Sequence, residues 1–249
     1  MAYDYQRLQV HKEGRIATVT VSNPPINIIT PELYAELAAL SRELKADPDL
    51  TVVVMKSADP DFFLAHFDVS AILRFPTDTE AQRDSELNEY HQMCERFRTM
   101  DKVTIAQIEG RVGGGGSELA ASFDMRFGVR GKTFVNQMEV PLGILPGGTG
   151  TQRLPRLVGR GRAMEIILGG DDIDAETAER WGYLNRSFAA DEIGPFVDRL
   201  ARRIASFPVE AVRLARRRSS ALTNPCTTGW STRLTCSSGC CAPTGRSET

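Results

Sequence analysis

Two glutamates stand beside turn-forming segments where a carboxyl group could carry out acid–base chemistry. Glu118 follows the glycine run 113–116, and Glu139 precedes the segment 140–143, which reads Val-Pro-Leu-Gly. A carboxyl group transfers protons effectively when the fold holds it beside a reacting atom. Each glutamate also has a structural interpretation. Glu118 could be an acid in the first turn of a helix, worth under about 1 kcal/mol, and Glu139 could be an exposed loop carboxylate.

The glycine run 113–116 could bring backbone N–H groups close to a ligand. Glycine has no Cβ, so its backbone can approach a bound group closely, and a helix that starts there adds the positive end of its dipole. N–H groups fixed in this way can polarise a carbonyl oxygen. The alternative is a flexible turn between a strand and a helix, but a turn alone does not explain the Ser-Glu-Leu-Ala that follows at 117–120.

Hydrophobic periodicity predicts the elements that must position these residues. One helix begins after an N-cap at Thr30 and ends at Asp47, with a buried stripe of leucines at helical spacing. These leucines are Leu33, Leu37, Leu40 and Leu44. Strands are expected at 8–11, 15–21, 51–56, 103–108, 125–129 and 133–136, and further helices at 79–100, 152–158, 160–168, 175–181 and 192–207.

The order of these elements predicts an α/β protein. Strands and helices alternate over the first two thirds of the chain, and helices dominate beyond residue 150. We therefore expect a core at 1–190 and a helical region at 191–218. Within that region Arg213 and the run 216–218 make a basic cluster, which we interpret as a solvated helix face.

The segment 219–249 differs from the rest in composition. Of its 31 residues, 13 are Ser or Thr and 4 are Cys, and Glu248 is the only acidic one. Such a segment buries too little apolar area to offset its ordering entropy, so we expect it to be disordered. The clustered cysteines lack paired C-x-x-C spacing, and no histidine follows His91. We therefore expect free thiols and no metal site.

The composition favours an ordinary globular protein of the cytoplasm. The chain has 249 residues, 41% hydrophobic and 25% charged, with a formal net charge of −2. This balance does not favour nucleic acid as a partner. The N-terminal residues lack a secretory pattern, and no apolar run approaches the roughly 20 residues of a membrane-spanning helix.

Four motifs in order resemble the enoyl-CoA hydratase/isomerase (crotonase) superfamily. They are Asn23-Pro-Pro-Ile-Asn27, Phe63-Leu-Ala-His-Phe-Asp68, Gly110-Arg-Val-Gly-Gly-Gly-Gly-Ser-Glu-Leu-Ala120, and Met138-Glu-Val-Pro-Leu-Gly143 with Leu145-Pro-Gly-Gly-Thr-Gly-Thr-Gln-Arg-Leu154. The resemblance implies a spiral of repeated ββα units with a C-terminal helical region, assembled as a homotrimer or a dimer of trimers. It fades after about Arg218.

The resemblance also implies a reaction. An enzyme of this kind adds water reversibly to a trans-2-enoyl-CoA to give a 3-hydroxyacyl-CoA, without a metal or redox cofactor. The amides of Phe67 and Gly115 would form the oxyanion hole. Glu118 would orient and activate the water, and Glu139 would transfer the proton at the α carbon.

Further residues are assigned to substrate binding by resemblance alone. They are Asn27, Ala65, His66, Asp68 and Gly114, and they would shape the site for the acyl-CoA substrate. Lys56 and Arg74 are candidates for the CoA phosphates, because Ser70 stands where many relatives carry a lysine.

Two other functions remain open. Δ3,Δ2-enoyl-CoA isomerisation needs only the glutamate at position 139, whereas a non-catalytic acyl-CoA-binding protein needs neither. The feature that bears on this choice is His66, which occupies the position of the family's usual glycine. We expect its imidazole to point away from the acyl pocket and the oxyanion hole to be intact.

Overall fold

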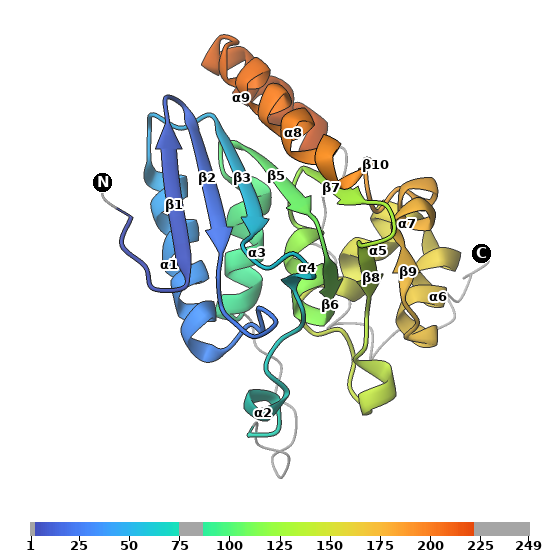
Figure 1. The fold of residues 1–249 in the computed structure, drawn as a ribbon. Coiled ribbons are helices and arrows are strands. Elements are labelled where there is room, and N and C mark those ends of the chain that lie inside the picture. The colour runs from blue at the N-terminus through green and yellow to red at the C-terminus, as the bar shows by residue number, and fades with distance from the viewer. Residues whose placement is uncertain (1–2, 75–86, 222–249) are drawn as a thin grey trace, which may run out of the picture.

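The strands form two sheets. The computed structural model describes residues 3–74 and 87–221, shown in Figure 1. The larger sheet has the order β1-β2-β3-β5-β7-β10, and the smaller has the order β4-β6-β8-β9. The larger contains β1 (Leu8–Glu13), β2 (Ile16–Val21), β3 (Val52–Ser57), β5 (Val103–Ile108), β7 (Met125–Val129) and β10 (Arg186–Phe188). The smaller contains β4 (Phe62–Leu64), β6 (Arg111–Gly113), β8 (Phe134–Asn136) and β9 (Ile173–Asp174).

From β3 to β8 the strands alternate between the two sheets, and a helix follows each pair. Strands β3, β5 and β7 join the larger sheet, and each is followed by a strand of the smaller sheet. Within each sheet the neighbouring strands of this region are parallel: β3, β5 and β7 in the larger sheet, and β4, β6 and β8 in the smaller. They are parallel because a helical crossover returns the chain to the same end of the sheet each time. The result is the repeated ββα architecture that we predicted (Figure 1).

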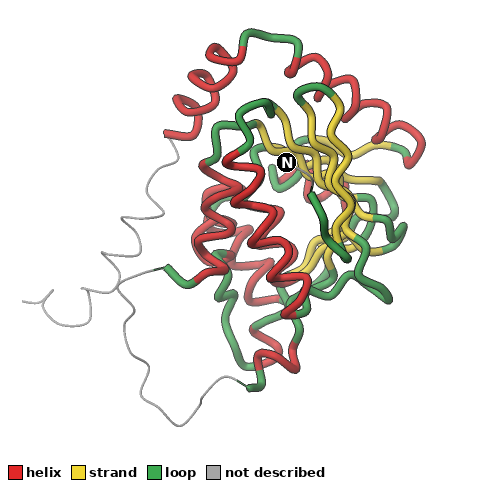
Figure 2. The backbone as a smooth tube through the Cα atoms, turned by 90° about the vertical axis from the view of Figure 1, so that its left-hand side faces the viewer, coloured by secondary structure: helices red, strands yellow, loops and turns green. Residues whose placement is uncertain are grey.

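The helices include a short 3-10 turn, η1, that follows β8. Their bounds are α1 (Pro31–Ala46), α2 (Val69–Ile72), α3 (Glu89–Thr99), α4 (Gly114–Ala120), η1 (Val140–Leu142), α5 (Gly150–Val158), α6 (Arg160–Gly169), α7 (Ala175–Trp181), α8 (Ala190–Ala205) and α9 (Val209–Ala221). Figure 2 shows helices stacked along one side of the sheets, with the C-terminal helices arching over their end.

The larger sheet is covered on both faces. The predicted leucine stripe of α1 is fully buried against one face, together with side chains of α3 and α4. Thr30 caps α1 by accepting the Leu33 N–H at 3.3 Å, as predicted. On the opposite face, Ile193 and Val197 of α8 pack against the valines and isoleucines of β3, β5 and β7. A sheet buried on both faces explains why these strands read as continuous apolar runs.

Three sequence predictions need correction. The helix predicted at 79–100 begins at Glu89, because the Asn88 side chain accepts the His91 N–H and caps that end. Its portion at 79–86 lies outside the described residues. Glu118 lies in the second turn of α4, since that helix already begins at Gly114 within the glycine run. The glycine run is therefore a helix start and not a flexible turn.

The basic cluster of α9 is a solvated face only in part, because Arg217 and Arg218 are exposed but Arg216 is not. Arg216 is buried, and its Nε lies 2.7 Å from a carboxylate oxygen of Asp124. Its guanidinium also donates to the carbonyl of Arg98. Helix α9 runs to Ala221 and so includes the first three residues of the predicted tail, 219–221. The remainder of that tail, 222–249 with its four cysteines, lies outside the described residues.

The N-terminus of α4 packs directly on the backbone of β4 and the residues after it. A Cβ added to Gly116 would lie 2.3 Å from the carbonyl oxygen of Leu64, and one added to Gly113 would lie 2.7 Å from that of Ala65. Both distances are far below a van der Waals contact. Only glycine permits this approach, which places the start of α4 beside the segment 64–67.

We predict that G116A is strongly destabilising. Alanine usually stabilises a helix relative to glycine by about 0.5–1 kcal/mol, but here its methyl group would force α4 away from Leu64. The matched control is G161A in α6, where an added Cβ meets nothing within 4 Å. Thermal unfolding should show a lowered Tm for G116A and an equal or higher Tm for G161A. Equal Tm values for the two variants would contradict the packing described above.

Candidate active site

A cavity of about 730 Å³ opens between α3 and the start of α4. Its lining combines two carboxyl groups with aromatic and aliphatic side chains. The lining residues are Tyr34, Phe67, Ile72, Asn88, Glu89, Tyr90, Gly115, Glu118, Glu139, Ile144, Leu145, Gly147 and Gly148. The mostly apolar walls suit an acyl chain, and the few polar groups converge on one region.

Glu118 reaches the cavity from the second turn of α4. Its carboxyl oxygens accept the backbone N–H groups of Gly148 at 3.0 Å and Gly150 at 2.7 Å. The residue is only 3% exposed. Burial raises its pKa to about 8, against the lowering effect of the two amides. A group with such a pKa can gain or lose a proton near neutrality.

Glu139 approaches the same cavity from the turn that precedes η1. It is 8% exposed, so the alternative of an exposed loop carboxylate is wrong. The Gln137 side-chain amide donates to its two carboxyl oxygens at 3.2 and 3.1 Å. Burial raises the pKa of Glu139, and its own backbone N–H, the Gln137 hydrogen bonds and the charge of His66 oppose the rise. The fold thus brings the two predicted glutamates onto one cavity from segments about twenty residues apart in sequence.

The backbone around Phe67 leaves one amide directed toward α4. In the parallel bridge between Ile29 and Phe67, the Ile29 N–H donates to the His66 carbonyl at 2.8 Å. The Asp68 N–H donates to the Ile29 carbonyl at 3.1 Å. A parallel bridge of this type uses the groups flanking Phe67, so the Phe67 N–H itself points to the opposite side.

Gly115 lies on that opposite side. A Cβ added to it would be 3.6 Å from the Phe67 nitrogen. Gly115 is also the second residue of α4, where the N–H has no acceptor within the helix. Two neighbouring amides therefore adjoin the cavity at the positive end of α4, which is the arrangement that our oxyanion-hole assignment requires.

Asn27 and Ala65 serve the backbone around the site. Asn27 is buried with a positive φ of 52°, and its side-chain amide donates to Ser57 Oγ at 2.7 Å. The same amide lies within hydrogen-bonding distance of the Phe63 carbonyl, at 3.2 Å. Ala65 donates its N–H to the carbonyl of Asn27. These contacts fix the segment that leads to Phe67, so the geometry favours a positioning role for Asn27.

The remaining predicted substrate-binding residues surround the same turn. His66 has a negative φ, so it occupies the glycine position without left-handed strain. Its Nδ1 lies 2.8 Å from the Phe67 carbonyl oxygen, and among the described residues it is not part of the cavity lining. Asp68 caps α2 through Ser70. Gly114 has a φ of +46°, and a Cβ there would lie 3.1 Å from Glu139 Oε1.

Sequence reasoning missed several contributors to the cavity. Tyr90 donates its hydroxyl to the Gly115 carbonyl at 2.5 Å, and its ring packs with those of Tyr34 and Phe67. Gly148 leaves room for the Glu118 carboxyl group, because an added Cβ would lie 2.2 Å from Glu118 Oε2 and would displace it. The motif around Gly148 was noted in the sequence, but nothing there indicated its contact with Glu118. Nothing in the sequence indicated a role for Tyr90, since an aromatic residue within a predicted helix is common.

The two candidates for the CoA phosphates lie on β3 and just after α2. Lys56 is half-buried at the end of β3, and Arg74 is exposed just after α2. Within residues 3–74 and 87–221 there is no group of three or more His, Cys, Asp or Glu side chains that could hold a metal ion. The helices in the same ranges include none long and apolar enough to cross a membrane.

Comparison with known proteins agrees with this architecture. A model of the enoyl-CoA hydratase/isomerase family matches residues 11–232. The chain is 32% identical to a short-chain-enoyl-CoA hydratase from Clostridium acetobutylicum, over 83% of this chain and 78% of that protein. It is also 32% identical to a crotonyl-CoA hydratase from Syntrophomonas wolfei, over 85% of this chain and 80% of that protein.

Solved structures give the same result. An enoyl-CoA hydratase from Bacillus anthracis superposes with a TM-score of 0.79 at 26% identity, covering 92% of this chain and 88% of that one. The chain therefore belongs to the enoyl-CoA hydratase/isomerase family, and its fold is the crotonase spiral. The family match continues to residue 232, beyond Arg218, where the sequence motifs had faded.

The raised pKa of Glu118 predicts a pH-dependent stability. The folded protein keeps a proton on Glu118 up to about pH 8, whereas the unfolded chain loses it near the ordinary value of 4.5. Between these values the folded state binds more protons, so the free energy of unfolding should fall as pH rises. The slope from one such group is at most about 1.4 kcal/mol per pH unit.

E118Q should lack this component because glutamine does not titrate. Denaturant unfolding from pH 5 to pH 8 should therefore show wild-type stability falling relative to that of E118Q. Glu139 is present in both proteins, so its own titration largely cancels in the comparison. Two stability curves that stay parallel over this range would contradict a raised pKa at Glu118.

Proposed function

We propose that this protein is an enoyl-CoA hydratase. The observation that carries the proposal is the pair of buried carboxyl groups, Glu118 and Glu139, on one largely apolar cavity beside the amides of Phe67 and Gly115. Hydration of a conjugated thioester needs a polarised carbonyl, a positioned water and a proton donor to the α carbon. The site offers one candidate group for each of these tasks.

The proposed reaction divides these tasks among the named residues. The thioester oxygen accepts hydrogen bonds from the amides of Phe67 and Gly115, which stabilise the charge that develops on it. Glu118 orients and activates a water, whose oxygen bonds to the β carbon. Glu139, in its acid form, delivers its proton to the α carbon, and Glu118, as a carboxylate, takes up the proton that the water loses. The carboxyl pair thus holds one proton before and after the addition. The net change is the addition of one water across the double bond.

The names of the relatives support this substrate class. The two curated relatives compared above are a short-chain-enoyl-CoA hydratase and a crotonyl-CoA hydratase. By the same family likeness we propose a homotrimer or a dimer of trimers that acts in the cytoplasm on acyl-CoA thioesters, with no metal or redox cofactor. Sizing of the purified protein tests the assembly. Lys56 and Arg74 stay our candidates for the CoA phosphates.

The second candidate function is Δ3,Δ2-enoyl-CoA isomerisation, which needs a single proton shuttle. The fold gives Glu118 two amide donors and a place on the cavity, which a one-carboxylate isomerase has no need of. This observation favours hydration. A non-catalytic acyl-CoA-binding protein has no need of either buried carboxyl group, and burying two of them opposes folding.

Substitution of each glutamate tests the division of roles. We expect E139Q to abolish hydration and any isomerase side activity, and E118Q to remove mainly hydration. Each loss should exceed about a hundredfold, the usual scale for a positioned acid or base. The measurement follows the absorbance of the conjugated double bond with a panel of enoyl-CoA esters of increasing length. Full hydratase activity in E118Q would refute the two-glutamate mechanism.

His66 gives a separate prediction. Its backbone has no left-handed strain and its imidazole contacts the neighbouring carbonyl, so we expect H66G to change turnover little. A higher turnover in H66G would instead show that the histidine impairs the oxyanion hole. A collapse of activity, with loss of one limb of the pH profile near neutrality, would show that the imidazole takes part in the reaction.

A further inference from the structure

The loop before α5 holds Glu118 through a strained residue. Gly148 and Gly150 donate the two amides that bind the Glu118 carboxyl, and Thr149 lies between them. Thr149 has a φ of 112° and a ψ of 0°, a conformation that side chains with a branched Cβ rarely adopt. Such a residue is strained and persists only where its surroundings enforce it.

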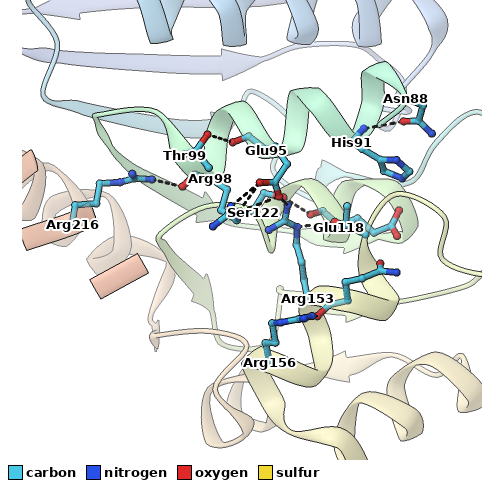
Figure 3. A network of polar contacts seen from close by, with 12 residues as sticks. Asn88, His91, Glu95, Arg98, Thr99, Glu118, Ser122, Arg153, Arg156 and Arg216 are labelled. Atoms are coloured by element: carbon cyan, nitrogen blue, oxygen red, sulfur yellow. Dashed lines mark hydrogen bonds and ion pairs between the residues drawn. The ribbon is translucent and has the colours of Figure 1, made fainter. Parts of the chain in front are cut away.

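The group that enforces it is the side chain of Arg153. The Arg153 Nε donates to Thr149 Oγ1 at 2.7 Å, and another nitrogen of the same guanidinium donates to Glu95 Oε1 at 2.7 Å. Figure 3 shows Arg153 of α5 facing Glu95 of α3 within a network of polar contacts. The Arg153 side chain is 5% exposed and that of Glu95 is 16% exposed, so solvent screens this ion pair little.

The planar guanidinium suits this position for a geometric reason. It presents several N–H groups in a fixed fork, so one end can hold Thr149 while the other end is anchored on Glu95. The ammonium of a lysine carries the same charge but acts as a single point, and cannot hold both partners in this geometry. Glu95 is itself fixed by Arg98, whose Nε lies 3.0 and 2.9 Å from its two oxygens.

A second contact limits what the loss of Arg153 would do. His91, also on α3, contacts the Gly147 carbonyl through Nε2. Helix α3 therefore holds the loop at two places, at Gly147 through His91 and at Thr149 through Glu95 and Arg153. Loss of the second place leaves the first, so the expected change is confined to residues 148–150.

We propose that Arg153, anchored by Glu95, is a positioning residue that holds Thr149 in its left-handed conformation and so keeps the amides of Gly148 and Gly150 on the Glu118 carboxyl. Neither Arg153 nor Glu95 is among the residues that line the cavity. The catalytic consequence of this proposal rests on the proposed hydratase function. The placement of the two amides on the Glu118 carboxyl group does not depend on that function.

Several groups influence the titration of Glu118. Burial is the largest influence, followed by the amide of Gly150, the charge of Glu139, the amide of Gly148 and the charge of Arg153. Its other ionisable neighbours are Tyr90, Cys94 and Tyr183. A test must therefore separate the geometric effect of Arg153 from the effect of its charge.

R153K makes this separation because it keeps the charge and removes the fork. The matched control is R202K, which removes an arginine fork held by Glu13 and Asp198 on the surface, away from Thr149 and Glu95. The rescue variant is T149G/R153K, since glycine adopts a φ near 112° without strain and no longer needs the fork. Thermal unfolding of all three variants establishes that each one folds.

Two readouts are expected to move together. In R153K the kcat for hydration should fall about tenfold or more, the scale of a misplaced catalytic group, with a smaller change in KM. The pKa of Glu118, followed by NMR with carboxyl-labelled glutamate and assigned with E118Q, should rise as the amide donors are lost. R202K should match the wild type in both readouts, and T149G/R153K should recover most of the loss.

The contrary results are equally distinct. Wild-type kcat and an unchanged Glu118 pKa in R153K would overturn the proposal. So would a T149G/R153K variant no better than R153K, because the ion pair would then act only on general stability. If the wild type hydrates no enoyl-CoA, the proposed function fails, and the NMR titrations still decide whether Arg153 positions the loop.

Discussion

The site depends on the close approach of two backbones, that of the α4 N-terminus and that of the segment 64–67. Gly113 and Gly116 lie against the carbonyls of Ala65 and Leu64 at distances that no side chain allows. This contact sets the amide of Gly115 beside that of Phe67. It also sets the direction of α4, and hence the position of Glu118 one turn later. The repeated ββα architecture supplies both backbones, because β4 and β6 are adjacent parallel strands of the smaller sheet.

A second constraint follows from the burial of two carboxyl groups in one cavity. Burial raises the pKa of both glutamates, and the fold opposes this with fixed donors: two amides for Glu118 and the Gln137 side chain for Glu139. The donors leave each carboxyl oriented, and a pKa of about 8 lets Glu118 exchange a proton near neutral pH. The elements that provide them, the loop before α5 and the strand end before η1, therefore matter to the chemistry as much as the glutamates do.

The sequence predicted what depends on local rules. The N-cap at Thr30, the leucine stripe of α1 and the apolar runs of the central strands all follow from spacing within one segment. The two glutamates emerged because their flanking motifs resemble a family. The start of α3 at Glu89 was missed because the segment before it is rich in residues that favour helices, and the Asn88 cap was not recognised. Arg216 was assigned to solvent because its partner, Asp124, is 92 residues away in sequence. The hydrogen bonds from Gly148 to Glu118 and from Arg153 to Thr149 are tertiary contacts, which no local sequence pattern reveals.

The most direct test of the account is a crystal structure of the protein with a bound acyl-CoA thioester. The account predicts that the thioester oxygen lies within hydrogen-bonding distance of the Phe67 and Gly115 nitrogens, with the carboxyl groups of Glu118 and Glu139 on the same side of the α and β carbons. A thioester oxygen that contacts neither amide, or an acyl group bound outside the cavity that the two glutamates share, would contradict it.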